Sequence, residues 1–224
     1  MSSLLFMGLL LVCSISLYFL YRWYDKDGLY VYIVFATLMG LILSLKIIKI
    51  NNFEAISYFP IYMSIFICIY FMLEKYGKKE IKNALYLVCF TAMIFIIMLG
   101  YEALFIPTLS NKILIHTKKL FIHNWGSIIA YVLILIFSII GSCYLYKYTK
   151  KYYDHIFINS AFTTIVVQLV DTLIFTVISY FFTLGLNDLF RVGVMTYSFK
   201  LMCCILYMPV FYLLMHFKKV KRSE

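Results

Sequence analysis

The stretch SAFTTIVVQLVDTLIFTVISYFF, residues 160–182, is long and apolar enough to cross a bilayer, yet it carries Gln168 and Asp171 near its middle. A membrane-spanning helix needs about 20 apolar residues, because each residue advances about 1.5 Å through a hydrocarbon core of about 30 Å. A carboxylate at the centre of such a helix costs roughly 2.5 to 3.5 kcal/mol on insertion scales, so it normally faces a partner or a watery cavity. Asp171 is therefore the first candidate functional residue.

The rest of the chain has the same apolar character. Of its 224 residues, 64% are hydrophobic and 13% are charged, and the mean hydropathy is +0.94. A water-soluble domain of this size could not bury so much apolar surface, and apolar runs of about 20 residues are typical of membrane helices. The sequence therefore predicts an all-α integral membrane protein, a bundle of six or seven transmembrane helices.

We expect one transmembrane domain over residues 1–224, with short connections between its spans. The first span has no basic residue before it and no small-residue cleavage site after it, which favours a retained helix over a signal peptide. The connection 107–125 is half apolar and is predicted to lie along the membrane interface. The expected spans are residues 4–21, 29–49, 56–73, 84–106, 126–146, 161–182 and 193–215.

The net charge of +10 would suit nucleic-acid binding in a soluble protein, but here Lys and Arg lie almost wholly in the short connections. We interpret them as topology signals and expect no nucleic-acid partner. Connections after the first, third, fifth and seventh spans are the richer in basic residues. Because such connections stay in the cytoplasm, the amino terminus is predicted outside and the carboxyl terminus inside.

Five ionisable residues remain in or near the spans: Lys46, Glu74, Glu102, Asp171 and Lys200. The first three lie near the ends of spans, so their side chains can reach the membrane interface and need no partner in the bundle. Asp171 and Lys200 lie deeper on adjacent spans, at depths that a lysine stem can bridge. They form either a structural ion pair or a substrate or proton site, and the two interpretations are compatible.

The neighbours of Asp171 favour a site. Thr164, Gln168 and Asp171 fall at i, i+4 and i+7, and Thr172 and Phe175 continue the same helical stripe. A carboxylate can accept two parallel hydrogen bonds from the edge of a guanine-type base, and an amide supplies both a donor and an acceptor. The predicted substrate-binding residues are therefore Thr164, Gln168, Asp171 and Lys200.

Enzymatic motifs are missing from the sequence. It contains no H-E-x-x-H, G-x-S-x-G or glycine-rich phosphate loop, and only one aspartate lies deep in a span. The six cysteines show no C-x-x-C spacing, so we expect free thiols. We expect no catalytic residues, no metal site and no cofactor.

Several motifs resemble one family of transporters. The run LEKYGKKEIKNAL, residues 73–85, resembles the E-K-Y-G-K-K-E-A signature of the queuosine precursor transporters, also called the vitamin uptake transporter family. The run TTIVVQLVDTLIF, residues 163–175, resembles that family's S-T-x-x-S-Q-x-x-D-T-x-x-F signature. YSFK at 197–200, followed by Pro209, is similar to the family's final helix, and residues 21–46 are similar to the branch with an additional first helix.

The resemblance implies a helical bundle that imports deazaguanine precursors of queuosine across a bacterial inner membrane. It also implies a second polar helix preceding the one with Asp171, here SIIAYVLILIFS at 127–138. Several polar positions of the family are replaced in this chain. The replacements are Leu135 for a glutamine, Ser138 and Tyr70 for aspartates, Leu41 for an asparagine, Leu43 for a glutamine and Asn159 for an arginine.

The leading hypothesis is an inner-membrane transporter that imports a small heterocyclic compound, by resemblance a deazaguanine queuosine precursor. Two alternatives stay open: a non-transporting membrane subunit or interaction protein with a degraded site, and a substrate-capture subunit of an energy-coupled vitamin transporter. The expected partners are a small-molecule substrate and the lipid bilayer. The sequence leaves a monomer and a homo-oligomer open.

Overall fold

The computed structural model describes residues 2–50, 53–104, 124–152, 155–181 and 184–216. Seven α-helices and one short antiparallel hairpin make up this part of the chain. The elements are α1 Ser2–Tyr24, α2 Lys26–Leu43, β1 Ile47–Ile50, β2 Phe53–Ile56, α3 Phe59–Lys75, α4 Lys78–Leu104, α6 Trp125–Thr149, α7 Ile156–Tyr180 and α8 Leu186–His216.

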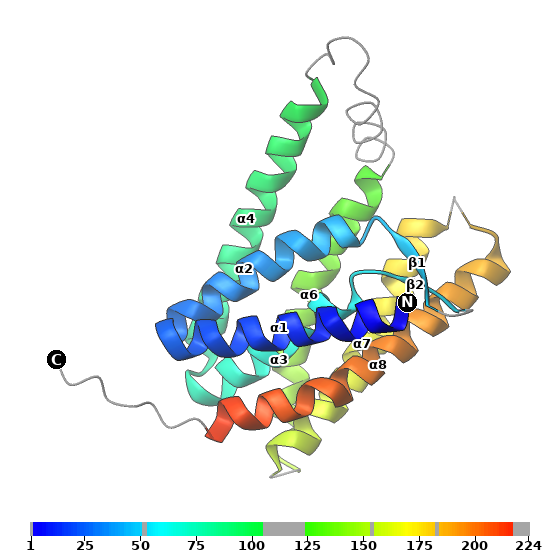
Figure 1. The fold of residues 1–224 in the computed structure, drawn as a ribbon. Coiled ribbons are helices and arrows are strands. Elements are labelled where there is room, and N and C mark those ends of the chain that lie inside the picture. Colours follow the sequence, from blue (N-terminus) through cyan, green and yellow to red (C-terminus); the bar gives the residue numbers. More distant parts are fainter. Residues whose placement is uncertain (1, 51–52, 105–123, 153–154, 182–183, 217–224) are drawn as a thin grey trace.

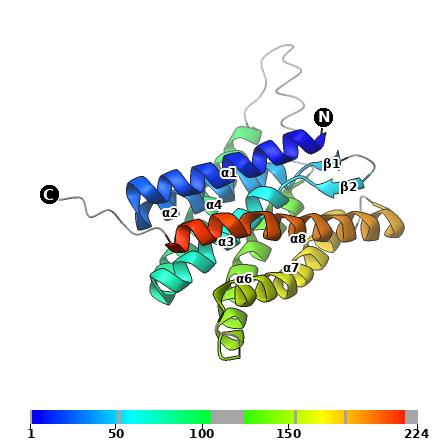
Figure 2. The ribbon, with the colours of Figure 1, turned by 60° about the horizontal axis from the view of Figure 1, so that its bottom comes forward.

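Helix α3 is the centre of the bundle. All its residues from 59 to 73 are buried, and α1, α2, α4, α6 and α8 each pack against it. Helices α1 and α8 run alongside α3, whereas α4 and α6 cross this group steeply (Figure 1). In the turned view α8 passes in front of α3, and α6 and α7 extend downward from this group (Figure 2). Because α3 is apolar on every side, it can be covered all round.

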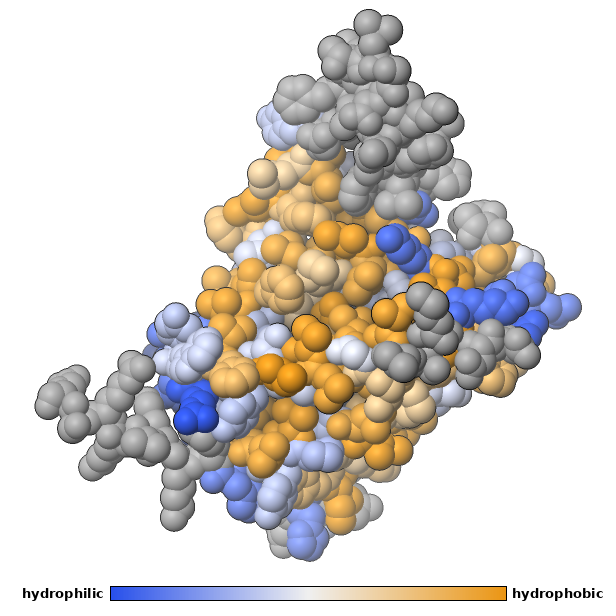
Figure 3. Space-filling model, in the orientation of Figure 1, coloured by the Kyte–Doolittle hydropathy of each residue, from blue (hydrophilic) through white to orange (hydrophobic). Residues whose placement is uncertain are grey.

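The outer surface suits a bilayer. Apolar side chains cover most of the visible face, and hydrophilic ones gather near its edges (Figure 3). Six helices in the described ranges are long and apolar enough to span a membrane, namely all except α3, which has 17 residues. The prediction of an all-α integral membrane bundle is confirmed.

Two ends of the bundle can be distinguished by their contacts. At one, Glu74 pairs with Lys150 at 2.6 Å and Glu80 with Lys26 at 3.4 Å, which joins the connections after α1, α3 and α6. We call this the basic end. At the other, the Tyr180 hydroxyl donates to the Ser44 carbonyl oxygen at 2.8 Å. The hairpin lies there, and we call this the hairpin end.

The hairpin is the main departure from the expected spans. The second span was expected to continue to residue 49, but α2 ends at Leu43 and the run IIKI forms β1. Isoleucine, branched at Cβ, favours strand over helix where a helix is not enforced by packing. The Ile56 amide donates to Thr196 Oγ1 at 3.1 Å, which ties β2 to α8. The predicted interfacial segment in 107–125 lies, over residues 107–123, outside the described residues.

Gly28 sets the close approach of α1 and α2. A Cβ added there would lie 2.0 Å from the backbone carbonyl oxygen of Leu20, and backbone cannot move aside as a flexible side chain can. We expect Gly28→Ala to destabilise the protein by about 1 to 3 kcal/mol, the range for overpacking a tight contact. Unfolding in detergent measures the effect, with Gly8→Ala as the matched control, since nothing lies within 4 Å of its added Cβ. Equal stability of the two variants would contradict this contact.

Candidate functional site

Asp171 and Lys200 form an ion pair in the interior of the bundle. The Lys200 ammonium donates to Asp171 Oδ1, and both side chains have 0% of their surface exposed. Asp171 comes from α7 and Lys200 from the next helix, α8. The ion pair, one of the two compatible interpretations that the sequence left open, is therefore present between adjacent helices. Neither charge could be stable at this depth without the other or an equivalent partner.

Two further donors complete the coordination of the Asp171 carboxylate. The hydroxyl of Tyr62, on α3, donates to Oδ2, and Ser138 Oγ, on α6, donates to the same oxygen at 2.7 Å. Three helices thus send one donor each to a carboxylate held by a fourth. Asp171 consequently fixes the arrangement of α3, α6, α7 and α8 around it.

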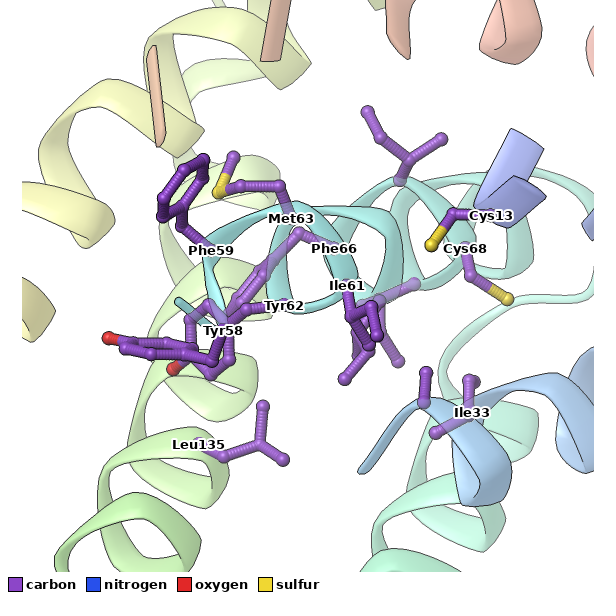
Figure 4. Packing of buried hydrophobic residues seen from close by; sticks show 14 of the residues in the cluster. Cys13, Ile33, Tyr58, Phe59, Ile61, Tyr62, Met63, Phe66, Cys68 and Leu135 are labelled. Atoms are coloured by element: carbon purple, nitrogen blue, oxygen red, sulfur yellow. The ribbon is translucent and has the colours of Figure 1, made fainter. Parts of the chain in front are cut away.

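Aromatic rings form one wall of the site. Tyr58 packs against Tyr62, Tyr131 and Phe175 with ring centroids 4.9 to 5.5 Å apart. The Lys200 ammonium lies 5.1 Å from the ring centroid of Tyr58 and 4.6 Å from that of Tyr62. Figure 4 shows Tyr58 and Tyr62 on the side of α3 that faces α6, near Leu135. Such a wall stabilises the cation and offers flat surfaces for stacking.

Gln168 lies on the same stripe of α7 and is wholly buried. Neither Nε2 nor Oε1 of its amide has a hydrogen-bond partner among the described residues. The hydroxyls of Thr172 and Tyr131, both buried, are equally without one in that part of the chain. Buried polar atoms are nearly always paired, and each unpaired one costs roughly 1 to 3 kcal/mol. These unused donors and acceptors could form hydrogen bonds with a polar ligand.

Thr164 belongs to a different network, about two turns closer to the basic end. Its hydroxyl donates to the Ser160 carbonyl oxygen at 2.7 Å and contacts the Tyr70 hydroxyl at 3.2 Å. The Tyr70 ring stacks on Tyr146 with centroids 5.4 Å apart. The structure therefore brings Gln168, Asp171 and Lys200 together in one region but gives Thr164 other contacts.

The network that begins at Thr164 ends at the basic end of the bundle. There the Tyr146 hydroxyl donates to Glu74 Oε1 at 2.6 Å, and Lys150 donates to both oxygens of the same carboxylate. The sequence explained Glu74 by its position near a span end alone. In the structure its carboxylate also holds α3 to α6. Nearby, burial and a hydrogen bond to Asp25 raise the pKa of the Tyr76 phenol well above its usual range.

A cavity of about 310 Å³ runs between α6 and α7. Ser138 and Asp171 are the polar side chains in its lining. The remaining lining residues are apolar or glycine: Ile134, Phe137, Gly141, Leu145, Val166, Val167, Val170 and Ile174. The volume lies at the small end of the range for small-molecule sites, roughly 300 to 1,000 Å³. The cavity therefore extends to the polar cluster at Ser138 and Asp171.

The sequence pattern missed four residues of this cluster: Tyr58, Tyr62, Tyr131 and Ser138. Ser138 falls where the resemblance expected an aspartate, and it keeps a hydrogen bond to Asp171, so this position stays polar. Leu135, one turn before it, is fully buried and apolar. The tyrosines carry no periodic signal, because tyrosine is frequent throughout the chain.

Groups of His, Cys, Asp and Glu that could hold a metal ion are absent from the described ranges. The site is built instead from one carboxylate, one ammonium, one amide, hydroxyls and aromatic rings. This set can stack on a flat ring and exchange hydrogen bonds with polar edges. It is suited to recognising a small planar polar molecule.

Comparison with known proteins gave two matches. The family model described as "Putative vitamin uptake transporter" matches residues 59–214, which run from α3 to α8. A protein of Bacillus subtilis (strain 168), described as "Probable queuosine precursor transporter", is 24% identical over 195 residues, which cover 86% of this chain and 85% of that protein. No solved structure matches the chain. Apart from Tyr58, the residues of the polar cluster lie within the range that the family model matches.

Proposed function

The chain belongs to the vitamin uptake transporter family, and from this premise we propose that it imports a queuosine precursor of the deazaguanine type. The description of the family model, "Putative vitamin uptake transporter", supports transport of a vitamin-like small molecule, and the Bacillus relative carries the narrower description. The proposed process moves the substrate across the bacterial plasma membrane and leaves it chemically unchanged. The protein is thus proposed to act as a transporter and not as an enzyme.

One observation carries the proposed substrate class: the buried amide of Gln168, with both polar atoms unused in the described part of the chain. A deazaguanine base has a flat ring and a lactam edge with one N–H and one C=O. An amide side chain matches such an edge with its own acceptor and donor. The rings of Tyr58 and Tyr62, which lie at the Lys200 ammonium, supply a stacking surface.

Each residue has a distinct proposed role. Gln168 pairs with the lactam edge, while the hydroxyls of Thr172 and Tyr131 bind further polar atoms of the substrate. Asp171 and Lys200 contact the substrate when the helices rearrange during transport, because in this structure their charges are occupied by each other. Thr164 is proposed to contact the substrate on its way toward the basic end.

The orientation is proposed from the connections. The basic connections after α1, α3 and α6 meet at one end of the bundle through the pairs of Glu74 and Glu80. Since basic connections face the cytoplasm, this end is proposed to lie inside and the hairpin end outside. The amino terminus is then outside and the carboxyl terminus cytoplasmic, in a single transmembrane domain.

Uptake can be measured in bacteria that cannot make the precursor, scored by queuosine in their tRNA. We expect the wild-type chain to restore queuosine when a deazaguanine precursor is supplied. Asp171→Ala is expected to abolish the restoration, because it removes the group that three other helices contact. Asp188→Ala is the matched control, since Asp188 is exposed in the first turn of α8 and should be dispensable.

Both variants must be present in the membrane at wild-type amounts for the comparison to count. Equal uptake by Asp171→Ala and wild type would contradict the role of Asp171. Failure of the wild-type chain to restore queuosine from any deazaguanine precursor would contradict the substrate. Restoration that collapses when an ATPase module of the host is removed would assign the chain to substrate capture for that module.

A further inference from the structure

A second cavity, separate from the polar cluster, lies between α4 and α6 at the basic end. Its volume is about 360 Å³. The α4 side contributes Lys78, Ile81, Lys82 and Leu85, and the α6 side contributes Ile140, Cys143 and Tyr144. Tyr144 has 74% of its surface exposed and Ile140 has 38%, so the cavity is a groove open to the surroundings of the bundle. We call it the α4–α6 groove.

The two lysines of the groove lie one turn apart on α4 and so share a face of that helix. Neither forms an ion pair in the described part of the chain. The nearby carboxylates are already engaged: Glu74 binds Lys150 and Tyr146, and Glu80 binds Lys26 and Tyr30. Lys78 is also the first residue of α4, where the helix dipole adds positive potential. The mouth of the groove is therefore strongly electropositive.

Below the lysines the groove is apolar. Ile81, Leu85 and Ile140 form its wall between two helices that are long and apolar enough to span the membrane. A basic mouth above an apolar wall matches a molecule with an anionic head and a hydrocarbon tail. In a bilayer that molecule is an anionic phospholipid, and basic pockets between membrane helices at the cytoplasmic side bind such head groups.

We propose that the α4–α6 groove binds one anionic phospholipid, with its phosphate between Lys78 and Lys82 and an acyl chain along Ile81, Leu85 and Ile140. Tyr144 lies at the rim, where an aromatic ring with a hydroxyl suits the head-group level. The site is independent of the transported substrate. Its effect would be to hold α4 to α6 at the basic end, beside the Glu74–Lys150 pair that holds α3 to α6.

The test is native mass spectrometry of the purified full chain in detergent, titrated with dioleoylphosphatidylglycerol or with dioleoylphosphatidylcholine. We expect the wild-type chain to retain one phosphatidylglycerol in preference to phosphatidylcholine. The double variant Lys78→Gln/Lys82→Gln should bind phosphatidylglycerol roughly twenty-fivefold more weakly, since each lysine near a membrane surface contributes about fivefold. The matched control is Lys79→Gln/Lys151→Gln, which removes the same charge from exposed positions outside the groove.

A further variant, Ile140→Trp, tests the apolar part without changing any charge. It should fill the groove and reduce lipid retention, while thermal unfolding reports that the variant is folded. Equal loss of phosphatidylglycerol in the two double lysine variants would overturn the site, because it would show general surface attraction. Stabilisation by glycerol 3-phosphate as strong as that by the lipid would overturn the lipid as occupant and assign the groove to a free phosphate.

Discussion

Asp171→Leu is expected to lower the free energy of unfolding by about 3 to 5 kcal/mol, because it leaves the Lys200 ammonium buried without its carboxylate. Lys200→Met should cost a similar amount for the converse reason. In Asp171→Leu, Tyr62 and Ser138 also lose the carboxylate oxygen to which both donate. Unfolding of the purified protein in detergent measures these changes.

The double variant Asp171→Leu/Lys200→Met separates a structural role from a transport role. Replacing both charges by apolar groups of similar size should recover most of the stability lost by each single variant. Uptake should nevertheless stay abolished, because the proposed transport contacts are gone. A double variant that is stable and transports at the wild-type rate would show that the pair serves only to hold α7 to α8.

Gln168→Met is expected to weaken substrate binding without lowering the stability of the protein. The variant keeps the length of the side chain but removes two buried polar atoms that have no partner in the described residues. Its stability without substrate should equal or exceed that of the wild type, since an unpaired buried polar group costs roughly 1 to 3 kcal/mol. Its affinity for a deazaguanine base should fall about tenfold to a hundredfold, because the lactam edge would lose its hydrogen bonds.

The measurement is a ligand-induced shift in thermal unfolding, followed by uptake in cells. Leu169→Met serves as the control, because Leu169 neighbours Gln168 on α7 but has 43% of its surface exposed. It should keep both stability and the ligand-induced shift. A Gln168→Met protein that is strongly destabilised, with its ligand shift intact, would mean that the amide supports the fold and does not bind the substrate.

The membrane class and the helices could be predicted from the sequence, because hydrocarbon imposes a length and an apolar character that any spanning helix must meet. The hairpin could not. Residues 47–50 are as apolar as the end of α2, and hydropathy does not distinguish a strand from a further turn of helix there. The isoleucines permit a strand, and tertiary contacts such as that between the Ile56 amide and Thr196 hold it in place.

The charged half of the site could also be predicted from the sequence, since an aspartate and a lysine deep in adjacent spans have few other partners available. Its aromatic half was not, because tyrosines at span ends suit the membrane interface equally well. Tyr146 illustrates the limit: its place near the end of a span suggests an interfacial ring, yet it is 1% exposed and bonded to Glu74. Whether a tyrosine points into the bundle depends on how α3 crosses α6. That crossing cannot be deduced from the residues around each tyrosine.

The Asp171–Lys200 pair also bears on how the protein is made. Asp171 precedes Lys200 by 29 residues, so the ribosome delivers the acidic helix first and the basic helix directly after it. Alone, each helix would carry one uncompensated charge into lipid. Delivered in succession, α7 and α8 can enter the bilayer as a helical hairpin whose charges neutralise each other before either meets hydrocarbon. The order of synthesis thus favours the same pairing that the folded protein keeps.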